Sequence, residues 1–403
     1  MRSMVEGKWR DLRIFPSTTA FSGGPPPHLS MGRNRIGPRP TPSCHPNITS
    51  NSRIEIKPAI PPYAGMTRFS VLDLVPVNEG SNPHEALKRA AAFAAHAESL
   101  GAHRYWVAEH HGMPGIASAA TAVVLAHIGQ ATSRIRIGAG GIMLPNHAPL
   151  LIAEQFGTLA ALFPGRVDLG LGRAPGSDQR VAQAMRRTLN GGPDDFPRDV
   201  MELQAYFAGD GRLGFQATPG AGEDVPLWIL GSSLYGAQLA AALGLPYAFA
   251  SHFAPGALDD AIAIYRRDFR PSAQLEQPYV MAGFNVFAAD TMEEARLVAT
   301  SMQQAFIRLR TGQPGKLQPP VPGYYESLPP QAQAILADVL SASSIGTQAD
   351  VERDLAAFIR RTQVDEVILG GQIHDFEARK RSLEIAMAAG QAVSASHEAT
   401  AAE

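Results

Sequence analysis

Short apolar runs alternate with longer helical segments along the chain from residue 66 onward. In the segment 83–100 the apolar residues recur at the i, i+3, i+4 and i+7 spacing of an amphipathic helix. Asn82 and Pro83 mark the start of that helix, and Gly101 marks its end. Eight other runs have the length and composition of buried strands, and they cover residues 69–75, 104–108, 135–139, 166–171, 227–230, 247–250, 280–288 and 366–369.

Eight strands that alternate with helices predict a parallel sheet, and eight is the number that closes into a TIM (β/α)8 barrel. A doubly wound open sheet is the alternative that this pattern leaves open. The intervals after the fourth and the seventh strand are much longer than the others. We therefore expect an α/β fold, a TIM barrel with insertions after strands 4 and 7, of the kind that often cover a substrate mouth.

The first 65 residues differ from the rest of the chain in composition and in the pattern of apolar positions. They are rich in Pro, Ser, Asn and Arg, and no apolar period of 2 or 3.6 persists that would give a face to bury. We expect residues 1–65 to be a disordered extension, or to follow from a start codon assigned upstream of Met66. The folded domain is predicted to cover residues 66–394, and residues 395–403 are predicted to form a flexible tail.

Composition and charge exclude several classes of function. The formal net charge of -2 gives no bulk attraction for nucleic acid or for anionic lipid. The single cysteine, Cys44, excludes a disulfide within the chain and a metal site built from cysteines. A run of about 18 apolar residues, which a membrane span requires, does not occur. We expect a cytoplasmic protein that binds neither nucleic acid nor a membrane.

The chemically unusual residues come almost always directly after a predicted strand, which places them on the catalytic rim of a barrel. Glu109, His110 and His111 follow the second strand. Neighbouring residues of an extended segment point to opposite sides, so one imidazole can face the mouth and move protons near neutral pH. A pair of structural histidines is the alternative.

A zinc site is a second alternative for the histidines. It would combine Glu109 with some of four histidines, namely His110, His147, His252 and His374. The HxH and HExxH spacings that are typical of zinc ligands do not occur among them. We therefore predict no metal.

Residues 231–236, with the sequence GSSLYG, precede a helical run and suit a phosphate group. Backbone N–H groups, two hydroxyls and the positive end of the helix dipole would meet there. A plain helix cap made by Ser233 is the alternative. Arg173, at the end of the fourth strand, adds a guanidinium that can pair with the phosphate. At the end of the third strand, Gly140 and Gly141 would let a flat ring approach the backbone.

Three motifs in combination resemble those of the luciferase-like, flavin-dependent monooxygenase superfamily, in its single-chain bacterial branch. They are residues 106–111 (WVAEHH), 138–145 (GAGGIMLP) and 164–173 (PGRVDLGLGR), to which the turn at 231–233 is added. The resemblance covers roughly residues 67–390. The resemblance implies a TIM barrel. The sequence departs from the family at Gly172, where luciferase has a reactive cysteine. Properties that depend on that thiol therefore do not transfer.

The resemblance also implies roles for single residues. His110 matches the catalytic histidine beside the flavin and the substrate. The pair Gly140-Gly141 falls where the family has a non-prolyl cis peptide packed beneath the isoalloxazine ring. The residues that match the phosphate-binding positions are Arg173, Ser232, Ser233 and Gly236.

The reaction implied by the resemblance uses reduced FMN and O2 to oxygenate a small organic substrate, either aldehyde-like or apolar. The segment 170–176 (GLGRAPG) lacks the GxGxxG spacing of a dinucleotide site, so we expect a separate flavin reductase. A homodimer is the expected assembly. The alternatives are hydride transfer with a deazaflavin, a non-catalytic flavin-binding protein and a metal-dependent hydrolase.

Overall fold

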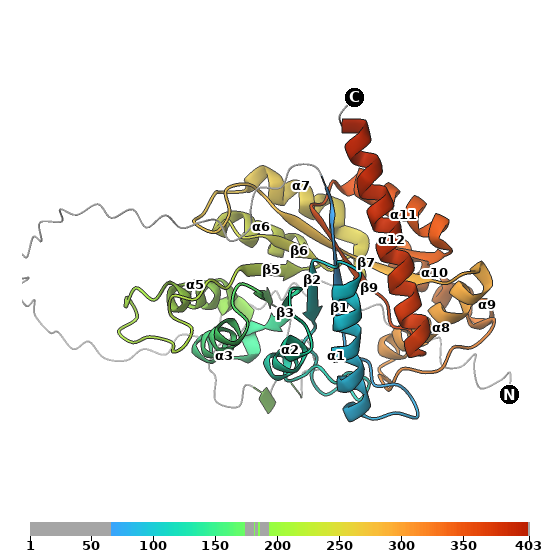
Figure 1. The fold of residues 1–403 in the computed structure, drawn as a ribbon, viewed down its shortest axis with the longest axis horizontal. Coiled ribbons are helices and arrows are strands. Elements are labelled where there is room, and N and C mark those ends of the chain that lie inside the picture. Colours follow the sequence, from blue (N-terminus) through green and yellow to red (C-terminus); the bar gives the residue numbers. More distant parts are fainter. Residues whose placement is uncertain (1–65, 174–180, 182–183, 186–192, 402–403) are drawn as a thin grey trace, which may run out of the picture. The chain divides into compact units, whose positions relative to one another are not determined.

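The computed structural model describes residues 66–173, 181, 184–185 and 193–401. Residues 1–65, for which we expect disorder or an incorrect start, lie outside this part of the chain. In the described part, eight parallel strands close into a barrel (Figure 1), because β6 pairs with both β5 and β7. The barrel strands, in their order around it, are β1 (Arg68–Asp73), β2 (Arg104–Val107), β3 (Arg136–Met143), β4 (Val167–Gly172), β5 (Leu227–Gly231), β6 (Tyr247–Phe249), β7 (Val280–Ala288) and β9 (Glu366–Gly370).

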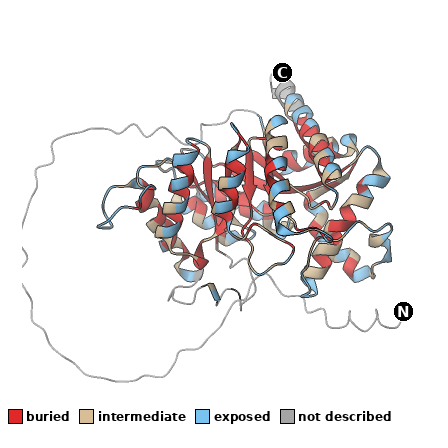
Figure 2. Ribbon diagram, turned by 60° about the horizontal axis from the view of Figure 1, so that its bottom comes forward, coloured by how far each residue is buried: buried red, intermediate tan, exposed pale blue. Residues whose placement is uncertain are grey.

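Helices surround the barrel, with buried inner faces and exposed outer faces (Figure 2). They are α1 (Pro83–Ser99), α2 (Thr121–Gln130), α3 (Pro149–Leu162), α5 (Phe196–Ala208), α6 (Leu234–Leu243), α7 (Leu258–Asp268), α8 (Met292–Arg310), α9 (Tyr324–Ser327), α10 (Pro330–Val339), α11 (Gln348–Thr362) and α12 (Phe376–Ala401). The last helix continues beyond residue 394, where we placed the end of the domain. Within the described residues, no helix combines the length and apolar character that crossing a membrane requires.

The start of α1 shows how local sequence fixes an element. The side chain of Asn82 accepts a hydrogen bond from the backbone N–H of Glu85, and Pro83 occupies the first turn, where its missing N–H costs nothing. The face of small and aromatic residues predicted for this helix, which includes Ala86, Ala90 and Phe93, is buried against the barrel. The predicted amphipathic helix is therefore confirmed.

All eight predicted strands are present, and the β6–β7 pairing rules out the open sheet. A ninth strand, β8 (Ser343–Gly346), was not predicted. It pairs only with the last part of β7, outside the closed barrel. Its two serines and its terminal glycine lack the β-branched composition that marks a strand. The long interval after β7 contains α8, α9, α10, β8 and α11, and the interval after β4 contains α5.

A buried ionic cluster lies at the N-terminal end of the barrel, the end opposite the rim. Arg104 at the start of β2 pairs with Asp168 of β4 (Nη1 to Oδ2, 2.6 Å) and with Glu366 of β9 (Nε to Oε1, 3.1 Å). All three residues are at most 1% exposed. Because β9, β2 and β4 alternate with β1 and β3 around the barrel, the cluster forms one layer of the barrel interior.

The charges of this cluster stabilise one another. Burial alone would raise the pKa of Asp168, but Arg104 and Arg136 outweigh it and lower the pKa to about 2. Burial likewise opposes the charge on Glu366, and Arg104 lowers its pKa below the usual value. The guanidinium of Arg104 also lies over the ring of Trp228 on β5, 4.8 Å from the centroid. The cluster therefore joins four strands of the barrel.

We expect Asp168→Asn to lower the free energy of unfolding by about 3–5 kcal/mol, because it leaves the buried Arg104 without its full counter-charge. Urea unfolding of the purified protein measures the change. Asp259→Asn is the matched control, since Asp259 and its partner Arg361 are both more than half exposed and such pairs contribute about 0–1 kcal/mol. Equal losses in the two variants would contradict a stabilising role for the cluster.

Candidate active site

The rim at the C-terminal ends of the strands contains an interruption in β3. The peptide bond between Gly140 and Gly141 is cis, and the pairing of β3 with β4 shifts register between Ala139 and Ile142. A Cβ on Gly141 would lie 2.7 Å from the carbonyl oxygen of Gly170, so this position has no room for a side chain. Gly140 is half-buried. The end of β3 thus carries a strip of backbone without side chains.

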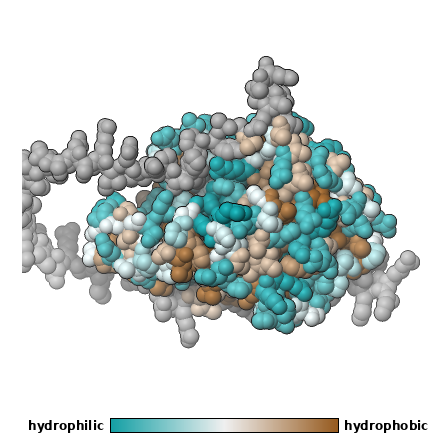
Figure 3. Space-filling model, viewed as in Figure 1, coloured by the Kyte–Doolittle hydropathy of each residue, from teal (hydrophilic) through white to brown (hydrophobic). Residues whose placement is uncertain are grey.

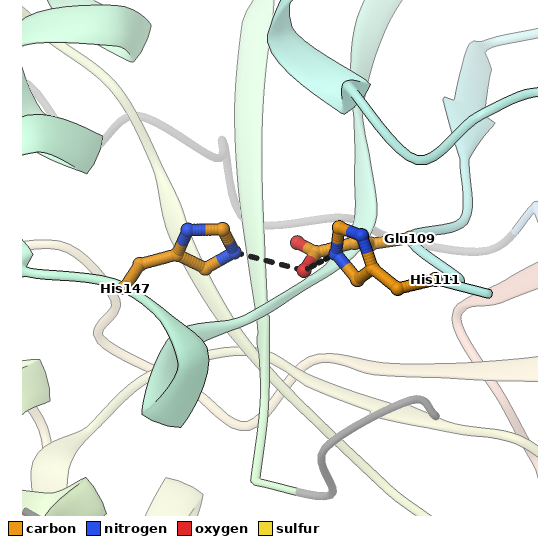
Figure 4. Close-up of side chains that lie close together, drawn as sticks. All are labelled: Glu109, His111 and His147. Atoms are coloured by element: carbon orange, nitrogen blue, oxygen red, sulfur yellow. Dashed lines mark hydrogen bonds and ion pairs between the residues drawn. The ribbon is translucent and has the colours of Figure 1, made fainter. Parts of the chain in front are cut away.

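Next to this strip, two histidines approach the carboxylate of Glu109 from two sides (Figure 4). The Nε2 atoms of His111 and His147 lie 2.6 and 2.8 Å from the same oxygen, Oε1. The other oxygen, Oε2, accepts a hydrogen bond from the backbone N–H of Met143 at 3.1 Å. Glu109 and His111 follow β2, whereas His147 follows a short 3-10 helix, η2 (Leu144–Asn146), after β3. One carboxylate therefore connects the ends of two strands.

Glu109 is 1% exposed, so its charge depends on these donors. Burial alone would raise its pKa, but the hydrogen bonds from His147 and His111, the charge of His147 and the Met143 N–H lower the pKa below its usual value. The group is therefore an anion at neutral pH, held by three donors.

His110, the predicted catalytic residue, is half-buried between Glu109 and His111. Burial and then the electrostatic effect of His110 lower the pKa of His252 to about 4. His252 follows β6, which stands across the barrel from β2. Trp106 and Ala108, which precede His110 by four and two positions, belong to the cluster that contains Met281 of β7 and so face the barrel interior. Alternation along the chain then places His110 on the same side. His252 is neutral at physiological pH, and its buried Nδ1 has no hydrogen-bond partner among the described residues.

Arg173 and the turn after β5 are brought together, as the phosphate hypothesis requires. The guanidinium carbon of Arg173 lies 4.0 Å from the ring centroid of Tyr235, in the first turn of α6. Ser233 is the N-cap residue of α6, yet its side chain makes no capping hydrogen bond within the described chain. The alternative of a plain serine cap is therefore wrong, and the N–H groups of the first turn are not used by that hydroxyl.

Ser232 and Gly236, the other two residues predicted to bind the phosphate, also lie at the N-terminus of α6. Ser232 is exposed beside the N-terminus of α6, and Gly236 is buried in the first turn of α6. A Cβ on Gly236 would lie 3.3 Å from the ring of Tyr247, which donates its hydroxyl to the carbonyl oxygen of Ser233. Gly236 thus lets the turn pack closely on β6.

The structure also shows one rim residue that the sequence analysis did not consider, Asn78, beside two histidines that it considered only as zinc ligands. Buried polar atoms without a partner among the described residues lie on the β6–β9–β1 side of the rim, at Asn78 Oδ1 and His374 Nε2 as well as at His252 Nδ1. Asn78 donates its amide to the carbonyl oxygen of His374. Asn78 was missed because an asparagine in a turn carries no sequence pattern that distinguishes a binding group from a structural one.

The histidines group differently from the zinc alternative. In the described residues, the group of potential metal ligands is Glu109, His111 and His147, whose ligand atoms lie within 4.8 Å of one another. His110 and His252 are not part of it. A cavity of about 590 Å3 lies at the opposite end of the barrel, beside Arg68, His103 and Arg136. This cavity is therefore remote from the candidate site residues at the C-terminal ends of the strands.

Comparison with known proteins adds independent findings. Residues 67–366 match a family described as luciferase-like monooxygenase. A luciferase-like monooxygenase of Escherichia coli (strain K12) is 52% identical over 320 residues, which cover 79% of this chain and 96% of that protein. An N-acetyl-S-alkylcysteine monooxygenase of Bacillus subtilis (strain 168) is 33% identical over 255 residues, covering 61% of this chain and 75% of that protein. The crystal structure of apo-MsnO8 has a TM-score of 0.73 at 32% identity, covering 81% of this chain and 98% of that one.

The matched region contains the cis peptide of β3, the Glu109 cluster, His252 and the contact between Arg173 and α6. The family was expected from three motifs and the turn after β5, and the comparison confirms it over most of the barrel. The chain belongs to the luciferase-like monooxygenase family.

Proposed function

We propose that the chain uses reduced FMN and dioxygen to oxygenate a small organic substrate. Membership of a monooxygenase family and the 33% identical relative named for such a reaction support oxygen transfer. The observation that carries the choice of FMN is the position of Arg173 beside the N-terminus of α6. A terminal phosphate there would receive a guanidinium, two serine hydroxyls and the N–H groups of the first helical turn.

The strip at Gly140 and Gly141 fits the flat ring of the same cofactor. Its backbone carries no side chain on the mouth side, so an isoalloxazine can pack directly against it. When bound, reduced FMN supplies the two electrons with which one atom of dioxygen enters the substrate and the other leaves as water. The sequence GLGRAPG at 170–176 is not a dinucleotide fingerprint, which supports a supply of reduced flavin from a separate reductase.

The residues of the chain position the reactants and control protons and water. We infer that His110 faces the mouth, where its imidazole would give or take the proton that oxygen transfer requires. Phe306 of α8 packs against Phe253 after β6, with ring centroids 6.4 Å apart, so apolar side chains cover this part of the rim. Excluding water from the mouth favours transfer of oxygen to the substrate over loss of hydrogen peroxide.

We expect Arg173→Ala to weaken FMN binding by about 1.5–3 kcal/mol, roughly 10- to 100-fold, because a charged hydrogen bond to the phosphate is lost. Anaerobic titration with reduced FMN, followed by flavin fluorescence after reoxidation, measures the affinity. Arg198→Ala is the control, since the Arg198 side chain is 66% exposed on α5. An unchanged affinity in Arg173→Ala would show that the phosphate assignment is wrong.

We expect His110→Ala to reduce product formation by about 100-fold while FMN affinity stays within about threefold, because a proton-transfer group is removed and no phosphate contact is touched. Product is measured with reduced FMN, oxygen and a panel of aldehydes and alkyl thioethers. His84→Ala, at an 83% exposed side chain, is the control.

Three results of these measurements would redirect the proposal. Wild-type activity that survives in His110→Ala would remove the catalytic role of that residue. Binding of a deazaflavin in place of both redox forms of FMN would indicate hydride transfer. Flavin binding without turnover of any substrate in the panel would favour the non-catalytic alternative.

We also propose a homodimer that forms through α2 and α3. Hydrophobic residues gather over these two helices (Figure 3), and Val123, Leu151 and Leu162 are 71%, 54% and 54% exposed. Such a patch on a surface is typical of a protein interface.

We expect Val123→Asp with Leu151→Asp to convert a dimer into a monomer in analytical ultracentrifugation, whereas Val321→Asp at another exposed apolar residue leaves the mass unchanged. A wild-type monomer would contradict the proposal.

A further inference from the structure

Glu109 uses both of its carboxylate oxygens to join two segments of the rim. Oε1 receives the two imidazoles and Oε2 receives the Met143 N–H. His111 follows β2, whereas Met143 ends β3 and His147 lies just beyond it. The side chains of His111 and His147 are only 17% and 25% exposed, so solvent competes weakly for these bonds. The carboxylate is therefore a bridge between the ends of β2 and β3.

The bridge fixes the direction of proton donation. Ionised Glu109 is an acceptor only, so the hydrogen bonds at 2.6 and 2.8 Å require a proton on Nε2 of both His111 and His147. A nearly inaccessible anion is stable only while such donors face it. The two rings are therefore held in one tautomer and one orientation by a single oxygen atom.

These three groups could also be read as metal ligands, but the distances favour the bridge. Ligand atoms around tetrahedral zinc, with bonds of about 2.1 Å, lie about 3.4 Å apart. The observed separations of 2.6 and 2.8 Å are hydrogen-bond distances.

Two elements of the proposed site are tied to the bridge. His110 stands between Glu109 and His111 in the chain, and the side chains of both neighbours are held by the bridge. Alternation along the segment then directs His110 to the side of Trp106 and Ala108, which face the barrel interior. Met143 follows the cis pair Gly140-Gly141 by two positions, so the bond from its N–H to Oε2 holds the strip on which the flavin would pack.

We propose that Glu109 is a positioning residue: its carboxylate, bridging His111, His147 and the Met143 N–H, holds His110 in the mouth and the Gly140-Gly141 strip in place. The inference rests on the proposed function, and it adds a residue that touches neither flavin nor substrate. An amide cannot replace the carboxylate, since a Gln side chain has only one acceptor atom and presents an NH2 group to the remaining donors.

Histidine ¹⁵N NMR tests the bridge without flavin. We expect the wild-type protein to show Nε2-protonated rings for His111 and His147, assigned by single His→Gln variants. In Glu109→Gln at least one ring changes tautomer, and Glu377→Gln, at a 76% exposed side chain on α12, leaves both unchanged. Wild-type rings protonated on Nδ1 alone would overturn the proposal. Equally, a divalent metal that copurifies with the wild type and is lost from Glu109→Gln would overturn it.

A double-mutant cycle tests whether Glu109 acts through His110. We expect Glu109→Gln to slow product formation by about tenfold in the wild-type background and by less than twofold in the His110→Ala background, because the misplaced group is already absent. His147→Leu, which removes one arm of the bridge, provides a second variant if Glu109→Gln does not fold. Equal effects in the two backgrounds would overturn positioning through His110. If no variant and no wild-type protein binds FMN, the proposed function fails, while the NMR result still decides the bridge.

Discussion

The buried pairing of Arg104 with Asp168 and Glu366 is the constraint on which the geometry of the rim depends. It anchors β2, β4 and β9 in one layer at the N-terminal end of the barrel. Glu109 follows Arg104, and Arg173 follows Asp168, by the same number of positions. Because parallel strands have a constant rise per residue, a layer fixed at one end sets the height of the functional residues at the other.

The rim that results has two unlike halves. From β2 to β5 it offers an anionic bridge, a strip without side chains, and an arginine beside a helix N-terminus. From β6 to β1 it offers buried polar groups, several of which have no partner in the described part of the chain. His110 and His252 follow β2 and β6, which stand on opposite sides of the barrel. A cofactor with an anionic tail suits the first half, because Arg173 and the N-terminus of α6 there would attract a negative charge.

Much of the fold could be predicted because the barrel strands are continuous apolar runs, buried on both faces. The segment 280–288, for example, is a nine-residue strand that is buried throughout. The strand β8 was missed for the opposite reason. Ser343 and Ser344 become part of a strand only because the end of β7 extends beyond the barrel and offers them a partner. Long-range pairing, which local composition does not encode, determined that element.

For the candidate site, too, some features follow from the sequence and others from the tertiary structure. The sequence by itself placed His110, Gly140, Gly141, Arg173 and the turn at 231–236 after strands, since strand order and strand ends are local properties. Only the tertiary structure decided which of them meet. It brought Tyr235 beneath Arg173 and paired Glu109 with His111 and His147, in place of the histidine set considered for zinc. Hydrogen bonds need positions accurate to a few tenths of an ångström, and only the closed barrel, with all its strand registers set together, provides them.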